Sequence, residues 1–354
     1  MTTRAEAVVD LAAVRHNVGV LRAAAGGAEV LAAVKADGYG HGAVPVARAA
    51  LEGGATWLGV VLVEEGVALR TAGIDAPVLV MMEPPPGAGE VAAAYDINLG
   101  VGSFASLHDA VDAGARVHLK VDTGLSRGGS VEWPDLVAAA VKADADVVGV
   151  WSHLACADDV GAASNATQVQ RFEAALTVAA EAGLAPRLRH LANSAATLTM
   201  PEARYDLVRP GIAVYGLTPV PGMDYGLRPA MTLRARVAMT KRVPAGTGVS
   251  YGHRYTTGAE TTLALVPLGY GDGIPRAAAN TAEVWIGGRR RTISGTVCMD
   301  QFVVDVGDDE VVAGDEAVVF GAEPTAQDWA DALGTISYEI VTRIAPRVPR
   351  RYVG

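Results

Sequence analysis

The sequence predicts an α/β protein with a (β/α)8 TIM barrel followed by a C-terminal all-β domain. Apolar runs of β character alternate with helical segments over roughly the first 200 residues, and several of the helical segments end in glycine. After Pro229 the pattern changes to short β-rich runs divided by turns. We expect the barrel at residues 8–230 and the β domain at residues 231–354, with residues 1–7 pairing with the β domain.

Size and composition agree with this division. The chain has 354 residues, 50% of them hydrophobic, which is enough for about two domains. A formal net charge of −10 argues against nucleic acid or an anionic membrane as a partner. No apolar run is long enough to span a membrane, no signal segment follows Arg4, and Cys156 and Cys298 lack metal-ligand spacing. We therefore expect a cytoplasmic protein without a metal site.

Eight apolar runs are the candidate barrel strands. The first, Val30–Val34, follows a helix that Asp10 can cap and that Gly26 and Gly27 end. The other seven lie at Trp57–Val63, Pro77–Met82, Ile97–Val101, Val117–Val121, Val147–Trp151, Leu188–Ala192 and Tyr205–Val208. Helical character is found at Ala43–Gly53, Val63–Gly73, Ser103–Gly114 and Gln168–Gly183. An open doubly wound sheet is the alternative, but it predicts a GxGxxG phosphate loop, which the sequence lacks.

The second domain should be all-β. The candidate strands are Thr232–Val243, Thr262–Val266, Ala282–Ile286, Thr292–Val297 and Ala317–Phe320. We interpret the acidic stretch Asp305–Glu316 as a solvated hairpin without a function of its own.

Lys35 is the first candidate functional residue. It ends the run Val30–Val34, at the end of a barrel strand where catalytic groups collect. A lysine at a strand end can also extend into solvent, and position alone does not exclude this structural interpretation. The loop behind Lys35 contains Tyr39 and the glycines 38, 40 and 42, which let backbone N–H groups come close to an anion.

Polar residues follow several other strands at the same end, where they would form one basic mouth in an acidic protein. Any one of them can be structural, but together they indicate an anionic ligand. The turns after the seventh and eighth strands lie where such barrels bind phosphate, and a phosphorylated cofactor beside a lysine indicates pyridoxal 5′-phosphate (PLP). The residues of this mouth are Lys35, Tyr39, Lys120, Asp122, Arg127, His153, His190, Asn193, Ser194, Arg209 and Gly211.

The sequence resembles the alanine racemase family over essentially its whole length. The first domain carries this resemblance at Val34–Gly42, Lys120–Gly124 with Arg127, Ser152–Leu154, His190–Ser194 and Arg209–Gly216, and the second at Val249–Gly252, Gly269–Gly273, Cys298–Gln301 and Ser337–Glu339. The resemblance implies a fold-type III PLP enzyme that interconverts L-alanine and D-alanine and supplies D-alanine for peptidoglycan. It also implies a homodimer whose sites combine both chains.

The resemblance also implies roles for single residues. Racemisation takes a proton from one face of Cα and returns one to the other, which two bases do most simply. The bases are then Lys35 and Tyr251, the tyrosine being contributed by the partner chain. Arg209 would face the pyridine nitrogen and keep it unprotonated. Arg127 and Met299 would bind the substrate, supported by Lys120 as a carbamate, Asp300 and Tyr270. The residues around PLP would be Lys35, Tyr39, His153, His190, Asn193, Ser194, Arg209, Gly211, Ile212 and Tyr338.

Two residues depart from the family pattern. Gly38 stands where the family usually has alanine, and Thr296 stands where some members have an arginine near the entrance. They leave open a racemase for other amino acids, such as serine or lysine. Two further alternatives are a fold-type III decarboxylase, which should use a cysteine acid in place of Tyr251, and a non-catalytic PLP carrier, which would lack the second domain.

Overall fold

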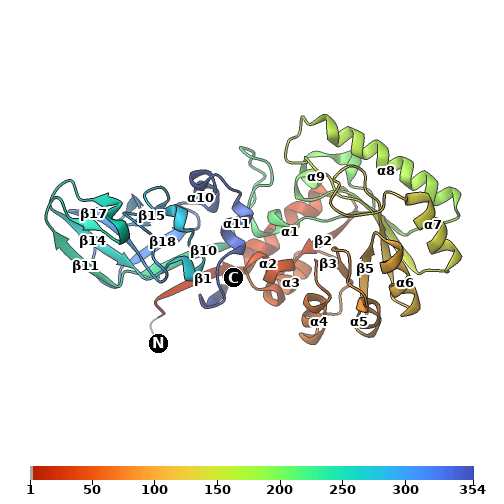
Figure 1. The fold of residues 1–354 in the computed structure, drawn as a ribbon, viewed down its shortest axis with the longest axis horizontal. Coiled ribbons are helices and arrows are strands. Elements are labelled where there is room, and N and C mark those ends of the chain that lie inside the picture. Colours follow the sequence, from red (N-terminus) through yellow and green to blue (C-terminus); the bar gives the residue numbers. More distant parts are fainter. Residues whose placement is uncertain (1–2) are drawn as a thin grey trace. The chain divides into compact units, whose positions relative to one another are not determined.

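The structure, a computed structural model, describes residues 3–354 as two compact units (Figure 1). One unit, called the barrel unit here, comprises Val14–Gly38 and Ala43–Arg228. The other, the β unit, comprises Pro229–Gly354 with Tyr39–Gly42 and the described residues up to Ala13. The domain bounds expected from the sequence stay a prediction. Residues 1 and 2, part of the segment expected to pair with the β domain, lie outside the described residues.

The barrel unit contains the predicted (β/α)8 barrel. Its eight strands are parallel and follow the order β8-β7-β6-β5-β4-β3-β2-β9. Between the two ends of this order, Asp206 N donates to Arg189 O over 3.0 Å and Arg209 N donates to Ala192 O over 2.9 Å. The strands are β2 (Glu29–Ala33), β3 (Trp57–Val60), β4 (Val78–Val80), β5 (Ile97–Val101), β6 (Val117–Lys120), β7 (Val147–Trp151), β8 (Leu188–His190) and β9 (Leu207–Val208). Each lies within or overlaps one of the eight predicted runs.

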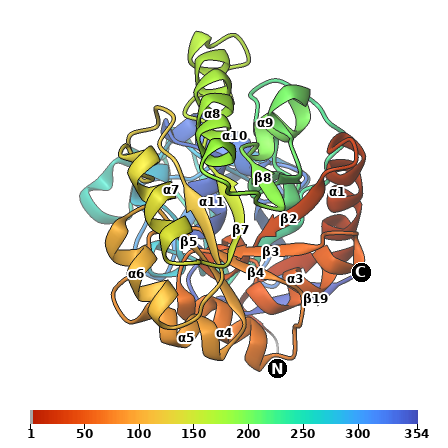
Figure 2. The ribbon, with the colours of Figure 1, turned by 90° about the vertical axis from the view of Figure 1, so that its right-hand side faces the viewer.

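Helices surround these strands, as Figure 2 shows. Asp10 caps the first helix as expected, because its Oδ1 accepts from the backbone N–H groups of Ala12 and Ala13. The helices are α1 (Leu11–Ala24), α3 (Ala43–Glu52), α4 (Val63–Thr71), α5 (Ala88–Ala94), α6 (Phe104–Asp112), α7 (Trp133–Lys142), α8 (Ala163–Glu181) and α9 (Ser194–Thr199). No helix of the described residues has the length and apolar character that a membrane crossing requires.

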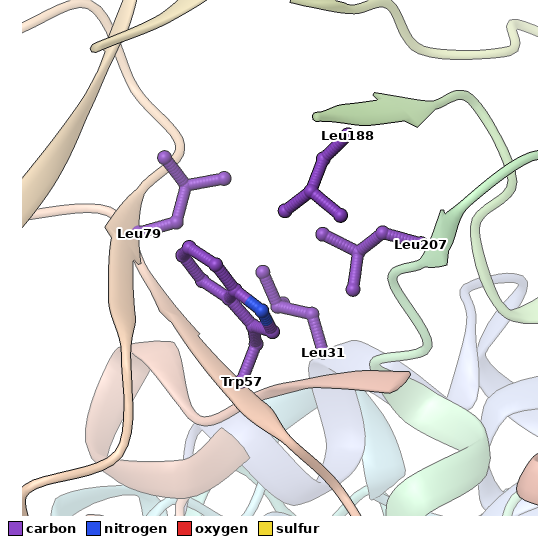
Figure 3. Close-up of a cluster of buried hydrophobic side chains, with 5 residues drawn as sticks. All are labelled: Leu31, Trp57, Leu79, Leu188 and Leu207. Carbon is purple, nitrogen blue, oxygen red and sulfur yellow. The ribbon is translucent and has the colours of Figure 1, made fainter. Parts of the chain in front are cut away.

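An apolar cluster fills one end of the barrel. Its members are fully or almost fully buried and come from five different strands; they are Leu31, Trp57, Leu79, Leu188 and Leu207 (Figure 3). Trp57, Leu188 and Leu207 are the first residues of their strands, so the cluster lies toward the strands' N-terminal ends. Burial of one such side chain contributes about 1.5–3 kcal/mol to folding. The opposite ends of the strands are thereby left to polar side chains.

The β unit is built from three sheets. The largest has the order β16-β15-β18-β10-β1-β19, the second β11-β14-β17 and the third β12-β13. In the largest sheet β1 (Ala5–Asp10) pairs antiparallel with β10 and parallel with β19. The other strands are β10 (Met231–Arg236), β11 (Met239–Val243), β12 (Gly248–Val249), β13 (Tyr255–Thr256), β14 (Thr261–Val266), β15 (Glu283–Ile286), β16 (Arg289–Thr292), β17 (Phe302–Gly307), β18 (Glu316–Phe320) and β19 (Arg350–Val353).

The β unit differs from the sequence expectation in three places. It contains two helices, α10 (Ala326–Leu333) and α11 (Ser337–Thr342), which were not predicted. The expected strand Thr292–Val297 is wrong, because β16 ends at Thr292 and the chain turns at Gly295, whose φ is +85°. The acidic hairpin is also wrong: β17 pairs with β14, whereas β18 pairs with β10 and β15, so the two strands belong to different sheets.

Candidate active site

Lys35 stands two residues after β2, at the start of a left-handed turn. Ala36, Asp37, Gly38 and Tyr39 all have positive φ, between 51° and 59°. A left-handed helical conformation costs about 1–2 kcal/mol for each residue with a Cβ, so the turn needs support. The Asp37 carboxylate accepts from Ala43 N over 2.9 Å, and Ala36 N donates to Glu65 Oε1 over 2.7 Å. The turn therefore holds Lys35 in one place instead of letting it follow a flexible loop.

Burial lowers the pKa of Lys35, and the positive charge of Arg127 lowers it further, against the opposing effect of Glu65. A larger fraction of this side chain is therefore the neutral amine than in an ordinary lysine. A neutral amine is both a nucleophile toward carbonyl carbon and a proton acceptor. The structural interpretation, a lysine extended into solvent, does not fit a partly buried side chain with a lowered pKa.

Arg209 is the central buried cation of the barrel unit. Only 4% of it is exposed, and it lies one residue after β9. Its Nη2 donates to Ser152 O over 2.7 Å and to Leu191 O over 3.2 Å, and lies 3.3 Å from His153 Nδ1. Its guanidinium carbon also lies 4.8 Å from the centre of the Trp151 ring. These contacts fix the guanidinium without a carboxylate partner among the described residues.

Two histidines, His190 and His118, form a chain of hydrogen bonds that leads from Arg209 into the barrel. His190, the last residue of β8, lies with Nδ1 3.0 Å from Arg209 Nη1. Its other ring nitrogen, Nε2, lies 2.8 Å from Nδ1 of His118, in β6. Both rings are fully buried; His190 stacks on Trp151, with ring centres 5.7 Å apart. Burial, with the charge of Arg209 as second cause, lowers the pKa of His190 well below its usual range and that of His118 to about 3.

Lys120 is the last residue of β6, and Arg127 belongs to the loop that follows this strand. Lys120 is buried, with Nζ 4.4 Å from the centre of the Trp151 ring. Burial, followed by the charges of Arg209 and Arg127, lowers the pKa of Lys120 to about 8. Arg127 is exposed, and the loop that carries it is held by Asp122, whose Oδ1 accepts from the backbone N–H groups of residues 124, 125 and 126.

The turns after β8 and β9 are joined by one hydroxyl. Ser194 Oγ accepts from Gly211 N over 2.8 Å and lies 3.4 Å from Ala213 N. Asn193 caps α9, because its Oδ1 accepts from Ala196 N over 3.0 Å. Ile212 follows Gly211 and is fully buried. The structure thus brings together two backbone turns and a serine hydroxyl, which is the arrangement expected of an anion cradle.

Within the β unit, Tyr39 lies against Tyr338 of α11, with ring centres 6.2 Å apart. Burial, and the neighbouring Tyr338, raise the pKa of Tyr39, so its phenol stays protonated. Gly40 allows close backbone packing here, since a Cβ at this position would lie 2.5 Å from the carbonyl oxygen of Val341. Gly40 O in turn accepts from Arg350 Nε over 3.0 Å.

Tyr251 and Met299 are exposed on the β unit, by 74% and 54%. The Tyr251 turn is held from both sides, because Ser250 Oγ donates to Thr296 O and Thr296 Oγ1 donates to Tyr251 O. Met299 O accepts from Gly271 N over 2.8 Å.

Asp272 links Tyr270 to Asp300. Asp272 is fully buried, and it forms ion pairs with Arg4 and Arg347 and accepts from Gly269 N. Arg347 also pairs with Asp300 over 2.8 Å. Tyr270 begins the short 3-10 helix η4 (Tyr270–Asp272), and its N–H donates to Cys298 O over 3.0 Å. One buried carboxylate therefore fixes the turns on which Tyr270, Met299 and Asp300 stand.

Comparison with known proteins decides the family. Residues 9–219 match the sequence model of the alanine racemase N-terminal domain, and residues 230–352 match that of the alanine racemase C-terminal domain. An alanine racemase of Thermobifida fusca is 58% identical over 371 aligned positions, covering 100% of this chain and 99% of that protein. The chain belongs to the alanine racemase family.

Solved structures of alanine racemases have the same fold. The crystal structure of the enzyme from Streptomyces lavendulae is 51% identical and matches with a TM-score of 0.98, covering 100% of this chain and 98% of that one. The Streptomyces coelicolor enzyme is 50% identical with a TM-score of 0.97, covering 99% of this chain and 98% of that one. Members of the family are isomerases that act as amino-acid racemases, and the protein is an enzyme of this kind.

The candidate residues of this alanine racemase family member divide between the two units. Lys35, Lys120, Arg127, His153, His190, Asn193, Ser194, Arg209, Gly211 and Ile212 belong to the barrel unit, and Tyr39, Tyr251, Tyr270, Met299, Asp300 and Tyr338 to the β unit. Sequence reasoning missed His118, Asp272 and Arg347. A signal for His118 was present, because it stands two residues before Lys120 in the same strand and so shares its face.

Proposed function

We propose that the protein interconverts L-alanine and D-alanine, uses PLP held on Lys35, and supplies D-alanine for peptidoglycan. The observation that carries this proposal is a partly buried lysine of lowered pKa at a barrel mouth, in a chain whose full-length relatives are alanine racemases. An alanine racemase of Bacillus anthracis, 35% identical with a TM-score of 0.93, has been solved with bound L-Ala-P, and its match covers 100% of this chain and 96% of that one.

The side chains of the barrel unit fit PLP by their chemistry. An amine, a hydroxyl between two backbone turns and a cation that carries no carboxylate would meet the aldehyde, the phosphate and the pyridine nitrogen respectively. Lys35, Ser194 with Gly211 and Ile212, and Arg209 are the residues in question. When bound, PLP condenses with an amino group and withdraws electrons from the adjacent Cα.

Arg209 sets the proton content at the pyridine nitrogen in this proposal. Burial lowers the pKa of Arg209, but a guanidinium remains protonated at neutral pH and has no lone pair to accept a proton. A neighbour that only donates leaves the pyridine nitrogen without a proton of its own. PLP held in this way would withdraw fewer electrons from Cα, so the proton at Cα would be returned quickly, which suits racemisation.

Lys35 and Tyr251 are the two proposed bases. Lys35 can accept a proton because burial favours its neutral form. Tyr251 is exposed on the β unit of its own chain, as expected of a group that completes the site of a partner chain in a homodimer. Each base would serve one face of Cα.

Tyr251→Phe tests this assignment. The variant keeps the ring and loses the ionisable oxygen, so exchange of the Cα proton with solvent should fall for one enantiomer of alanine and persist for the other. Proton NMR in deuterium oxide measures both rates. Equal losses for L-alanine and D-alanine would contradict face-specific bases.

Lys120 resolves a problem of like charges in the substrate subsite. Arg127 and Met299 are proposed to bind the substrate carboxylate, the first by its guanidinium and the second by its backbone N–H, with Asp300 and Tyr270 as supports. A cationic Lys120 would repel Arg127 and Arg209, which is one cause of its lowered pKa. The neutral amine can add to the carbon of CO2 and lose a proton, and the resulting carbamate is an anion that attracts Arg127.

Turnover on a panel of L-amino acids tests the function as a whole. Alanine should be racemised with the highest kcat/KM, and a pocket of this kind discriminates between side chains by about 1–3 kcal/mol. Preference for serine or lysine would make this a different racemase, and release of CO2 would make it a decarboxylase. Tyrosine at position 251, where a decarboxylase should have a cysteine acid, argues against the latter.

A homodimer with shared sites and a cytoplasmic location complete the proposal. The exposed side chains of Tyr251, Met299 and Tyr270 support a shared interface. Both cysteines are free, as is usual in a reducing compartment.

A further inference from the structure

We infer that His118 is a positioning residue that fixes the tautomer of His190 and thereby the orientation of Arg209. The hydrogen-bond directions on which this depends follow from the structure alone. The effect on turnover rests on the proposed function, so the two parts are tested by separate measurements.

The directions begin at Arg209. A guanidinium can only donate, so Nδ1 of His190, 3.0 Å from Nη1, must be the acceptor and carries no proton. Full burial beside this cation keeps His190 neutral, which leaves its single ring proton on Nε2. That N–H can satisfy itself only by donating to Nδ1 of His118, 2.8 Å away. His118 therefore supplies the acceptor that makes one tautomer of His190 favourable.

The other ring nitrogen of His118, Nε2, shows that a histidine at this position is unfavourable for stability. Since Nδ1 accepts, the proton of the neutral His118 ring lies on Nε2, and Nε2 is buried with no hydrogen-bond partner among the described residues. The ring stands edge-on to Trp57, with ring centres 5.4 Å apart at 78°. An apolar side chain would fill this space without leaving an N–H unsatisfied. A histidine is explained here by its acceptor nitrogen and not by packing.

The neighbouring strand β7 leaves space for the imidazole ring of His118. A Cβ at Gly149, in β7, would lie 2.4 Å from His118 Nδ1 and 2.9 Å from Leu188 O. Only glycine leaves room for the imidazole between β6 and β8. If His118 were removed, the other tautomer of His190 would point a donor N–H at the donor N–H of Arg209, so neither tautomer would be satisfied.

Nitrogen-15 NMR of protein labelled at histidine tests the tautomers directly. In the wild-type protein we expect His190 and His118 both to carry the proton on Nε2 and to have an unprotonated Nδ1, without change from pH 8 down to about pH 6, because burial holds both pKa values lower. Resonances are assigned by their loss in single variants. A proton on Nδ1 of either ring in the wild-type protein overturns the inference, whatever the enzyme catalyses.

Two substitutions separate the acceptor from the ring. His118→Asn loses the ring but keeps an acceptor, because Oδ1 of asparagine is attached to Cγ as Nδ1 of histidine is. His118→Phe keeps a ring of similar size and loses the acceptor. We expect the His190 Nδ1 resonance to stay at its wild-type position in the Asn variant and to move toward that of a protonated nitrogen in the Phe variant.

Turnover should follow the acceptor as well. We expect kcat to fall about tenfold in the Phe variant and to recover at least in part in the Asn variant, with KM for alanine changed less than kcat, as for other residues that orient a functional side chain. A role in packing alone predicts the reverse order, with Phe near wild type and Asn impaired, and that order overturns the inference. Thermal unfolding of both variants shows whether a loss of turnover reflects a loss of folded protein. If the Phe variant does not fold, the tautomers measured in the wild-type protein still test the inference.

Discussion

Three cationic side chains, Lys35, Lys120 and Arg209, belong to the barrel unit. Burial is the largest cause of the lowered pKa of each of the two lysines, and a neighbouring arginine is the second. An arginine keeps its proton at neutral pH, so the charge that opposes the protonated lysines is permanent. Burial, together with Arg127 beside Lys35 and with Arg209 and Arg127 beside Lys120, thus raises the neutral fraction of both amines.

The lowered pKa of Lys35 leads to a spectroscopic prediction. The purified enzyme loaded with PLP should show a visible absorption band, and Lys35→Ala should lose it, because the other lysines lie outside the turn after β2. The matched control is Lys142→Ala, at the exposed last turn of α7, which should keep the band. A band that is retained in Lys35→Ala and bleached by hydroxylamine would contradict the assignment.

Lys120 gives a prediction with a defined pH dependence. Its pKa is lowered to about 8, so the neutral amine becomes the major form above pH 8, whereas an ordinary lysine requires pH values above its usual pKa. In bicarbonate labelled with carbon-13, a carbamate signal should therefore grow as the pH rises from 7 to 9. Lys120→Arg should abolish the signal. If the wild-type protein gave no carbamate signal, carbamylation of Lys120 would not explain how Lys120 and Arg127 can lie close together.

Most candidate residues of the barrel unit could be named from the sequence because each stands at or near the same end of a predicted strand, and their roles stay a prediction. It could not show that His190 connects Arg209 to His118, since that depends on which rings meet inside the barrel. Asp272 was hidden for a similar reason. Its partners Arg4 and Arg347 come from opposite ends of the sequence, and only the folded sheet brings them together.

At the scale of elements, the left-handed turn after β2 continues into Gly40, which packs on α11. Gly40→Ala should destabilise the protein in two ways. Its φ of +78° costs about 1–2 kcal/mol for a residue with a Cβ. The clash with Val341 O should add about 1–3 kcal/mol, because a backbone atom cannot rotate away.

Gly246→Ala is the matched control for this prediction. Gly246 belongs to the same unit and has a φ of +80°, but a Cβ there meets nothing within 4 Å. The difference between the two variants in free energy of unfolding, measured in urea, isolates the clash. If Gly40→Ala and Gly246→Ala lowered the free energy of unfolding equally, the backbone around α11 would be able to move and relieve the clash.

Elements of the barrel were easier to predict than those of the β unit. Most barrel strands are short apolar runs buried on both faces, which stand out from the helices around them, although β8 has the exposed Arg189 at its centre. In the β unit Thr325 and Asp328 form a capping box that marks the start of α10. Helix α10 was still not predicted, because only the strands of this all-β domain were named. The strand expected at Thr292–Val297 failed because β-branched residues also occur where a chain turns, here at Gly295.

For the whole molecule, the proposed sharing of sites between two chains predicts complementation. Lys35→Ala and Tyr251→Phe chains are each expected to lose racemase activity. Co-expressed, they should form heterodimers in which one site has both lesions and the other has neither, so activity returns. A site built within one chain would carry a lesion in every heterodimer, and activity would stay at the level of the single variants. Different affinity tags on the two chains confirm that the heterodimer is present.

The strand β1 has a consequence for synthesis of the chain on the ribosome. Ala7 pairs with Leu233 on one side and Arg350 on the other, so β1 leaves the ribosome long before either of its neighbours. At about 5–20 residues per second, roughly 20 to 70 seconds separate Ala7 from Arg350. By then the whole barrel segment, Val14–Arg228, has been synthesised. The largest sheet of the β unit can therefore be completed only after β19 has been synthesised, long after β1 and the barrel segment.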